Sequence, residues 1–300
     1  MSDKKISMIS VISIGILGPA GTFSENAANE WIDGISDEQQ YGRIEYKLHY
    51  FDDIADIVDE VGTSIDIGIV PVENSTQGSV EVTLDSLLVG KRAIIGEIII
   101  PVRHCLLASG DIEDITTIVS HPQPLAQCRR FLRENFKGID VHSTLSTAQG
   151  AKMAAQSHSI ASIGPEGLAK RYNLAILRRD IQDIADNYTR FLVLTHEKDR
   201  KRFEMPVSGA KSVGYKTSII VYLQQDHPGA LYETLKEFAI RNINLTKIES
   251  RPSKKVAWGY RFYIDFEGSI NDDTVSEALF AMKHLIDEIH ILGSYPAATI

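Results

Sequence analysis

The sequence has few cysteines, a deficit of positive charge and no long apolar run. Its 300 residues include two cysteines, Cys105 and Cys128, so a disulfide framework or a zinc site of the usual cysteine spacing is excluded. Lysine and arginine total 31 against 40 for aspartate and glutamate, and the net charge of −9 argues against nucleic acid or an anionic membrane as the main partner. No stretch approaches the roughly 20 apolar residues of a membrane span. An anionic ligand would therefore have to be held by local donors.

The first 20 residues contain a pattern that resembles the start of a secretory signal peptide. Lys4 and Lys5 precede a mostly apolar run over residues 6–17. Serines interrupt this run, and cleavage after Ala20 would remove the segment Ile12–Leu17, which we expect to be the first strand. The sequence therefore favours a cytoplasmic protein.

The composition is that of a globular protein large enough for two domains. Hydrophobic residues make up 43% of the chain and charged residues 24%, which are ordinary values. Short apolar segments alternate with helical patterns as far as Leu194, and this alternation predicts an α/β fold with a largely parallel sheet covered by helices. Strands are expected at Ile12–Leu17, Ile44–Tyr50, Ile65–Val70, Ile98–Leu107, Ile115–Ser120, Ile139–Ser143, Ile160–Ile163 and Phe191–Leu194, and helices include Asp52–Val61, Pro124–Asn135, Thr147–Ser157 and Pro165–Arg171.

One apolar run is too long for an ordinary strand. It extends from Ile94 to Leu107 and contains Pro101, which a central strand tolerates poorly. We therefore expect this segment to cross from one lobe to another, with the return crossing near residues 185–190. The sequence thus predicts a two-lobed region over residues 10–200.

A change in composition marks a second domain. Polar and flexible residues such as Ser208, Gly209 and Gly214 indicate a linker, which we place at residues 201–215. Over residues 216–300 the pattern predicts strands and helices in the order βαββαβ, which is the ferredoxin-like arrangement. The strands are expected at Thr217–Gln224, Ile243–Ser250, Val256–Phe266 and Ile289–Ser294, and the helices at Pro228–Arg241 and Asp273–Asp287.

Three polar segments stand where predicted strands begin or end. Thr189 and Arg190 precede the strand Phe191–Leu194, a glycine-containing segment from Gly18 to Glu25 follows the first strand, and residues 73–79 follow the third. Open α/β folds bind ligands at such strand ends, so we expect these segments to converge on one site. The first of them can present a helix N-terminus and hydroxyl groups to an anion. A dinucleotide site is disfavoured there, because the glycine spacing is not G-x-G-x-x-G and Pro19 removes a donor.

Four segments, in order along nearly the whole chain, resemble those of the prephenate dehydratases. They are Gly18–Ser24, Pro71–Ser75, Thr189–Phe191 and Glu249–Pro252. This resemblance implies a two-lobed catalytic region like that of the periplasmic binding proteins, with the site in the interlobe cleft. It also implies that residues 216–300 form an ACT domain, a module that senses amino acids.

The resemblance implies a reaction that needs no redox cofactor and no metal. Prephenate is a dianion that loses its ring carboxylate as carbon dioxide and its C4 hydroxyl as water, and the aromatic ring that forms supplies the driving force. The implied catalytic residues are Thr189, as a hydrogen-bond donor to the departing oxygen, and Glu73, as an orienting group or second proton donor. Arg190 either pairs with a substrate carboxylate or faces away and holds a structural one, because alternate residues of a strand face opposite ways. The other candidate substrate-binding residues are Ala20, Gly21, Thr22, Ser24, Asn74, Ser75, Ser120, His121, Gln123 and Phe191.

In the ACT domain, the resemblance implies an effector site for phenylalanine between subunits, in a homodimer or homotetramer joined through these domains. The candidate residues are His227, Gly229, Ala230, Leu231, Asn244, Leu245, Glu249 and Ser250. The chain has Asp226-His227-Pro228 where the family usually has Asn-Lys-Pro. Two alternatives to a prephenate dehydratase remain open at this point: an arogenate dehydratase, and a non-catalytic metabolite sensor.

Overall fold

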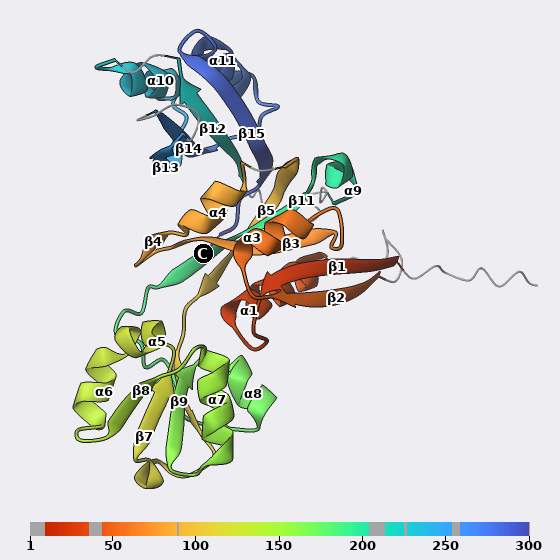
Figure 1. The fold of residues 1–300 in the computed structure, drawn as a ribbon. Helices are drawn as coiled ribbons and strands as arrows, with labels where there is room; N and C mark the ends of the chain where they lie inside the picture. Colours follow the sequence, from red (N-terminus) through yellow and green to blue (C-terminus); the bar gives the residue numbers. More distant parts are fainter. Residues whose placement is uncertain are drawn as a thin grey trace, which may run out of the picture.

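The computed structural model describes residues 10–35, 44–88, 90–203, 214–224, 227–253 and 259–299. These residues form three parts that follow one another in space: a second lobe at one end, a first lobe in the middle and a C-terminal domain at the other end (Figure 1). None of the described helices is long and apolar enough to cross a membrane.

The first lobe is built on a sheet with the strand order β2-β1-β3-β11-β5, to which β4 adds beside β3. Its strands are β1 (Ser10–Leu17), β2 (Ile44–Phe51), β3 (Ile67–Asn74), β4 (Gly78–Ser79), β5 (Arg92–Pro101) and β11 (Tyr188–His196). Its helices are α1 (Phe23–Ile35), α3 (Ile54–Glu60), α4 (Glu81–Ser86) and the short α9 (Arg200–Phe203). The strands are buried by α1 on one face, where Ile14, Ile69 and Val193 lie in the core.

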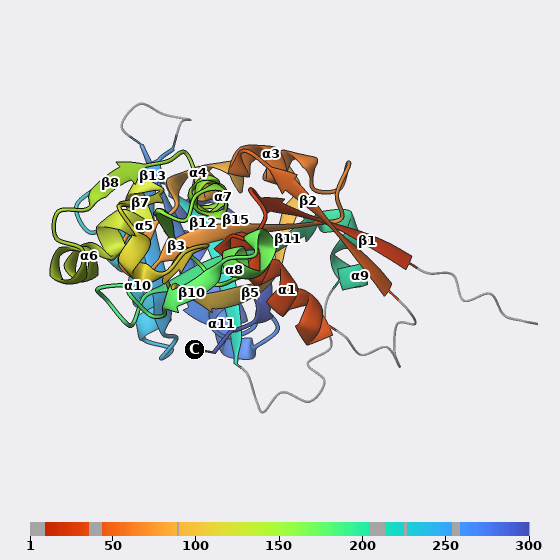
Figure 2. The same cartoon turned by 90° about the horizontal axis from the view of Figure 1, so that it is seen from below.

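The second lobe has a sheet of its own, in the order β10-β6-β9-β7-β8. Its strands are β6 (Cys105–Ala108), β7 (Thr117–Ser120), β8 (Asp140–Ser143), β9 (Ile160–Gly164) and β10 (Ala175–Arg178). Its helices are α5 (Pro122–Gln127), α6 (Arg129–Asn135), α7 (Thr147–Gln156) and α8 (Gly167–Tyr172). Figure 2 gives the view from the side of this lobe.

The two lobes are joined by two crossing segments, as the long apolar run predicted. β5 ends at Pro101 and β6 begins at Cys105, so residues 102–104 make the first crossing. The return crossing lies beside it, because Val102 N donates to Asn187 O at 2.7 Å and Ile181 N donates to His104 O at 3.0 Å. The two-lobed α/β arrangement expected from the sequence is confirmed.

The expectation of a largely parallel sheet was wrong, because both sheets are mixed. β1 pairs in parallel with β2 and β3, whereas β11 is antiparallel to both β3 and β5. In the second lobe, β7 is parallel to β8 and β9, but β6 is antiparallel to β9. Apart from the two-residue β4, which folds back on β3, the antiparallel pairs involve strands next to the crossings, since a strand that enters a lobe from the other lobe does not follow the local alternation of strand and helix.

The C-terminal domain has the predicted βαββαβ order. It comprises β12 (Tyr215–Leu223), α10 (Ala230–Ala239), β13 (Leu245–Pro252), β14 (Tyr260–Glu267), α11 (Asp273–Met282) and β15 (Ile286–Pro296). The sheet is antiparallel with the order β13-β14-β12-β15, and both helices cover one face of it (Figure 1). Of the linker expected at 201–215, residues 204–213 lie outside the described residues, and Phe203 is buried in the first lobe.

The other face of this sheet packs directly on the first lobe. Ile220, Tyr222 and Tyr295 lie in one hydrophobic cluster with Ile94 and Leu192 of the first lobe. β15 contacts β5, and the backbone approach is so close that a Cβ at Gly293 would lie 2.1 Å from Ile94 O. The two parts therefore share a core.

Candidate active site

A cavity of about 680 Å³ lies between the two lobes. The first lobe contributes the segment after β1, the end of β3 and the start of β11, and the second lobe contributes the N-terminal ends of α5 and α7. The three segments that the sequence placed at strand ends thus meet at one cavity. Its apolar lining includes Phe23, Val102 and Phe191.

Thr189 lies at the cavity and is held by Asn74. The side-chain amide of Asn74, on the neighbouring strand β3, donates to Thr189 Oγ1 at 3.0 Å and to Asn187 Oδ1 at 2.8 Å. The Asn74 carbonyl oxygen accepts from Thr76 N and Gln77 N, both at 3.1 Å, which fixes the amide orientation. Because Thr189 Oγ1 accepts from Asn74 and no described residue accepts from it, its hydroxyl proton is free to point into the cavity.

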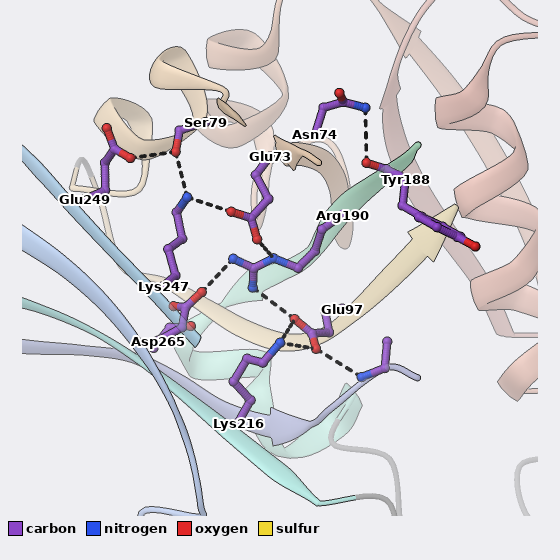
Figure 3. Close-up of polar contacts among 12 residues, drawn as sticks. Glu73, Asn74, Ser79, Glu97, Tyr188, Arg190, Lys216, Lys247, Glu249 and Asp265 are labelled. Atoms are coloured by element: carbon purple, nitrogen blue, oxygen red, sulfur yellow. Dashed lines mark hydrogen bonds and ion pairs between the residues drawn. The ribbon is translucent and has the colours of Figure 1, made fainter. Parts of the chain in front are cut away.

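Arg190 lies on the opposite side of β11 and does not line the cavity. Its side chain is 7% exposed and donates to Glu73, Glu97 and Asp265, which is on the C-terminal domain (Figure 3). Of the two orientations that the sequence left open for Arg190, the structure has the one that faces away from the cleft. Glu73 points the same way and also accepts from Lys247 Nζ at 2.7 Å.

The pKa values of this pair follow from their contacts. Burial acts to raise the pKa of Glu73, but Arg190 and Lys247 outweigh it and lower that pKa below its ordinary value. Burial acts to lower the pKa of Arg190, and the charges of Asp265, Glu73 and Glu97 raise it well above its ordinary value. Glu73 is therefore held as a carboxylate and lies outside the cavity lining, in contact with cations.

The segment after β1 brings some of its predicted residues to the cavity. Thr22 and Ser24, at the N-terminus of α1, line it, and Thr22 Oγ1 is buried without a hydrogen-bond partner among the described residues. Ala20 and Gly21 do not line it. The Gly21 N–H donates to Glu25 Oε2 at 2.5 Å, and a Cβ at Gly21 would lie 2.6 Å from Leu168 Cδ2 of α8. Gly21 therefore marks a close approach between the lobes.

The second lobe presents two of its three predicted residues. His121 and Gln123 line the cavity, and His121 caps α5 by accepting from Gln123 N at 3.3 Å. Gln123 Nε2 donates to Gln77 Oε1 at 2.6 Å and so joins the two lobes across the cleft. Ser120 is buried and donates to Ile163 O, away from the lining. Ser75 is exposed and exchanges hydrogen bonds with the backbone of Tyr188, the first residue of β11.

His104 and Gln127 also line the cavity and were missed by sequence reasoning. His104 is 1% exposed, its Nε2 donates to Gln127 Oε1 at 2.7 Å, and its Nδ1 is left as a buried acceptor without a partner in the described part of the chain. Burial lowers the pKa of His104 below its ordinary value, although the bond to Gln127 acts in the opposite direction. The sequence signal that could have identified His104 as a site residue was its position in the predicted crossing between the lobes.

The electrostatics of the cavity come from helix ends. The N-termini of α1 and α7 open into it, with Ser146 capping α7 by accepting from Gln149 N at 3.1 Å. Exposed N–H groups and the helix dipole make such ends favourable for anions. Within the described ranges, no lysine or arginine lines the cavity, and the acidic Asp52 does. Anion binding here would depend on N–H and hydroxyl donors.

The predicted effector residues lie in two places within one chain. Gly229, with φ +96°, begins α10 next to Ala230 and Leu231, while His227 is exposed. Asn244 and Leu245 lie at the start of β13 and Ser250 near its end. Glu249 faces the first lobe and accepts from Ser79 Oγ at 2.8 Å (Figure 3).

Comparison with protein-family models gives two matches. The model described as "Prephenate dehydratase" matches residues 14–199, and the model described as "ACT domain" matches residues 217–284. Together they account for both lobes and most of the C-terminal domain.

Similar proteins cover nearly the whole chain. A prephenate dehydratase of Methanocaldococcus jannaschii is 41% identical over 281 residues, which are 93% of this chain and 96% of that protein. The chloroplastic arogenate dehydratase/prephenate dehydratase 2 of Arabidopsis thaliana is 36% identical over 99% of this chain and 76% of that protein. Among solved structures, a prephenate dehydratase of Arthrobacter aurescens in complex with L-Phe is 29% identical, with a TM-score of 0.78 over 96% of this chain and 93% of that one.

Proposed function

Because the chain belongs to the prephenate dehydratase family, as a hydro-lyase of phenylalanine biosynthesis with a C-terminal ACT domain, we propose that its interlobe cavity binds prephenate and that Thr189 assists departure of the C4 hydroxyl. The observation that carries this proposal is the hydrogen bond from Asn74 to Thr189 Oγ1. This bond occupies the acceptor side of the hydroxyl and leaves its proton for a substrate oxygen.

The two carboxylates of prephenate suit the two helix ends. The N-terminus of α1 comes from the first lobe and that of α7 from the second, so a dianion between them gains favourable contacts on both sides. Thr22 and Ser24 add hydroxyl donors. The contact between Gln77 and Gln123 closes the cleft over such a ligand.

The reaction then proceeds without a further group. The electron pair of the ring C–COO⁻ bond moves into the ring as carbon dioxide leaves, and the C4–O bond breaks as hydroxide departs. Thr189 donates a hydrogen bond to that oxygen as its negative charge develops, and the departing hydroxide becomes water by taking one proton from the solvent. Part of the cavity wall is apolar and excludes water, because it is formed by Phe23, Val102 and Phe191. A carboxylate beside this wall is poorly solvated, which favours its loss as carbon dioxide.

The test of this proposal is the turnover of Thr189 variants. Thr189→Val should lower kcat by on the order of 10² to 10³ and leave KM for prephenate little changed, since one preorganised donor is lost. Thr189→Ser should recover a good part of kcat. Thr195→Val is the matched control, because Thr195 lies on the same strand and donates to Asp66 O far from the cavity lining. Wild-type turnover in Thr189→Val would end the assignment.

The regulatory part of the proposal is that phenylalanine binds between ACT domains of two subunits. Within one chain, Gly229–Leu231 adjoin the end of β12, near Ser250, whereas Asn244 lies six residues before Ser250, or about 20 Å along β13. One phenylalanine cannot span both groups, but a second copy can bring them together. β13 is an edge strand of the sheet and is available for such pairing.

Two measurements test this regulation. The protein should sediment as at least a dimer, and phenylalanine should slow the reaction several-fold to roughly 150-fold, as expected for coupling of about 1–3 kcal/mol. Full inhibition of a protein that remains monomeric would contradict a site between subunits.

We place the protein in the cytoplasm. β1 is the signal-like segment, and it pairs with both β2 and β3 inside the first sheet. Its Ile14 and Ile16 are fully buried. Removal of this segment would therefore open the core of the first lobe.

A further inference from the structure

The ACT domain reaches the strand that carries Thr189 through a buried network of charges. We propose that Asp265, on β14, is a positioning residue for Thr189 that acts through Arg190. This inference rests on the proposed role of Thr189. It means that a residue of the ACT domain helps to position a side chain of the cleft.

Each nitrogen of the Arg190 guanidinium has a different carboxylate partner. Nε donates to Glu73 Oε1 at 2.6 Å, Nη1 to Glu97 Oε2 at 3.0 Å and Nη2 to Asp265 Oδ2 at 2.6 Å. The three carboxylates come from β3, β5 and β14, so they fix the guanidinium in three directions (Figure 3). Asp265 is the partner that the two lobes do not supply.

The charges on the two sides of this interface are complementary. The charged residues of the first lobe at this interface are Glu73, Glu97 and Arg190. Their ion-pair partners include Lys216, Lys247 and Asp265 of the ACT domain. Lys216 Nζ donates to both oxygens of the fully buried Glu97, at 2.7 and 2.9 Å. If Asp265 loses its charge, a buried guanidinium keeps an incompletely compensated charge, and the network has to rearrange.

A rearrangement of Arg190 is transmitted to Thr189 because the two residues are adjacent near the start of β11. Thr189 faces the cavity and Arg190 faces the ACT sheet, as strand alternation requires. The ladder with β3 is interrupted at this point, since its register shifts between Arg190 and Phe191 and Val72 is left out, whereas the ladder with β5 is continuous here. The side-chain contacts of Arg190 therefore help to fix where the Thr189 hydroxyl points.

A double-mutant cycle with prephenate turnover tests this. In the wild-type background, Asp265→Asn should lower kcat by on the order of 10-fold to 100-fold, because small displacements of a catalytic group have effects of this size, and KM should change little. In the Thr189→Val background, Asp265→Asn should cause little additional loss of kcat, since the hydroxyl group that Asp265 positions is already absent. Phenylalanine is omitted throughout.

The matched control is Asp85→Asn, which weakens another ion pair of the same interface. Asp85 lies on α4 and accepts from two arginines of the ACT domain, Arg261 Nη2 at 2.6 Å and Arg251 Nη2 at 3.4 Å. This variant should lose stability and keep its kcat in both backgrounds. If circular dichroism shows that Asp265→Asn does not fold, Asp265→Glu replaces it in the cycle, because it keeps the charge and displaces the guanidinium by its extra methylene.

Two results would overturn the inference. An unchanged kcat in folded Asp265→Asn would show that Arg190 needs no partner from the ACT domain. An equal loss of kcat with and without the Thr189 hydroxyl would show that Asp265 supports the fold in general. Either result leaves the role of Thr189 intact, whereas wild-type turnover in Thr189→Val removes that role and this inference together.

Discussion

At the residue scale, strand alternation predicted that neighbouring side chains of β11 face opposite ways, and the contacts in the structure show which of them faces the cleft. The sequence predicted that Thr189 and Arg190 face opposite ways, and the partners of Arg190 decide which one faces the cleft. These partners are up to 117 residues away along the chain, in segments whose relative placement depends on the packing of two domains. No local pattern in the sequence carries that information.

His104 gives a residue-scale prediction about pH. Burial lowers the pKa of His104 in the folded protein below its ordinary value of 6.5. At pH values below 6.5, the unfolded chain therefore takes up a proton at this histidine more readily than the folded protein does. Stability should therefore be lost as the pH falls from about 6.5 toward the lower folded pKa. Urea unfolding at pH 7.5 and 5.5 should show a smaller loss for His104→Gln than for the wild type. Equal losses would mean that His104 does not contribute.

At the scale of elements, the sequence located the helices and strands better than it located their partners. The long apolar run with Pro101 correctly indicated a crossing between lobes, because proline and excess length are local signals. The helix expected at Pro124–Asn135 is instead interrupted at Cys128, where φ is −115° and ψ is 21°. The strand β10, four residues long, was not expected.

Gly21 gives a prediction at this scale. It has φ +86° and approaches Leu168 of α8, so Gly21→Ala forces both a left-handed alanine and a contact of 2.6 Å with a leucine methyl group. We expect a loss of about 1–2 kcal/mol from the backbone alone and a higher KM, since α1 and α8 can no longer approach. Gly34→Ala, near the C-terminus of α1 and with nothing within 4 Å, is the control and should be neutral or slightly stabilising. Thermal unfolding that is equal for the two variants would contradict the close approach.

At the scale of the whole molecule, the sequence suggested a linker and an ACT module, while the structure shows a shared core. The run Ile219, Ile220 and Val221 is fully buried, because the helices cover one face of β12 and the first lobe covers the other. A continuous apolar run is typical of a strand buried on both faces, so a signal for this contact was present in the sequence. This run indicated that both faces of β12 are buried, but it could not indicate that the first lobe covers one of them.

If one chain forms a complete catalytic cleft for prephenate, the purified protein should turn this substrate over without a second component. The decisive experiment is product identification after the purified protein is given prephenate or arogenate in separate reactions. We predict phenylpyruvate and carbon dioxide from prephenate, with little phenylalanine from arogenate. A protein that binds prephenate and returns it unchanged would rule out a dehydratase and favour a metabolite sensor. Preferential conversion of arogenate would assign the cleft to that substrate instead.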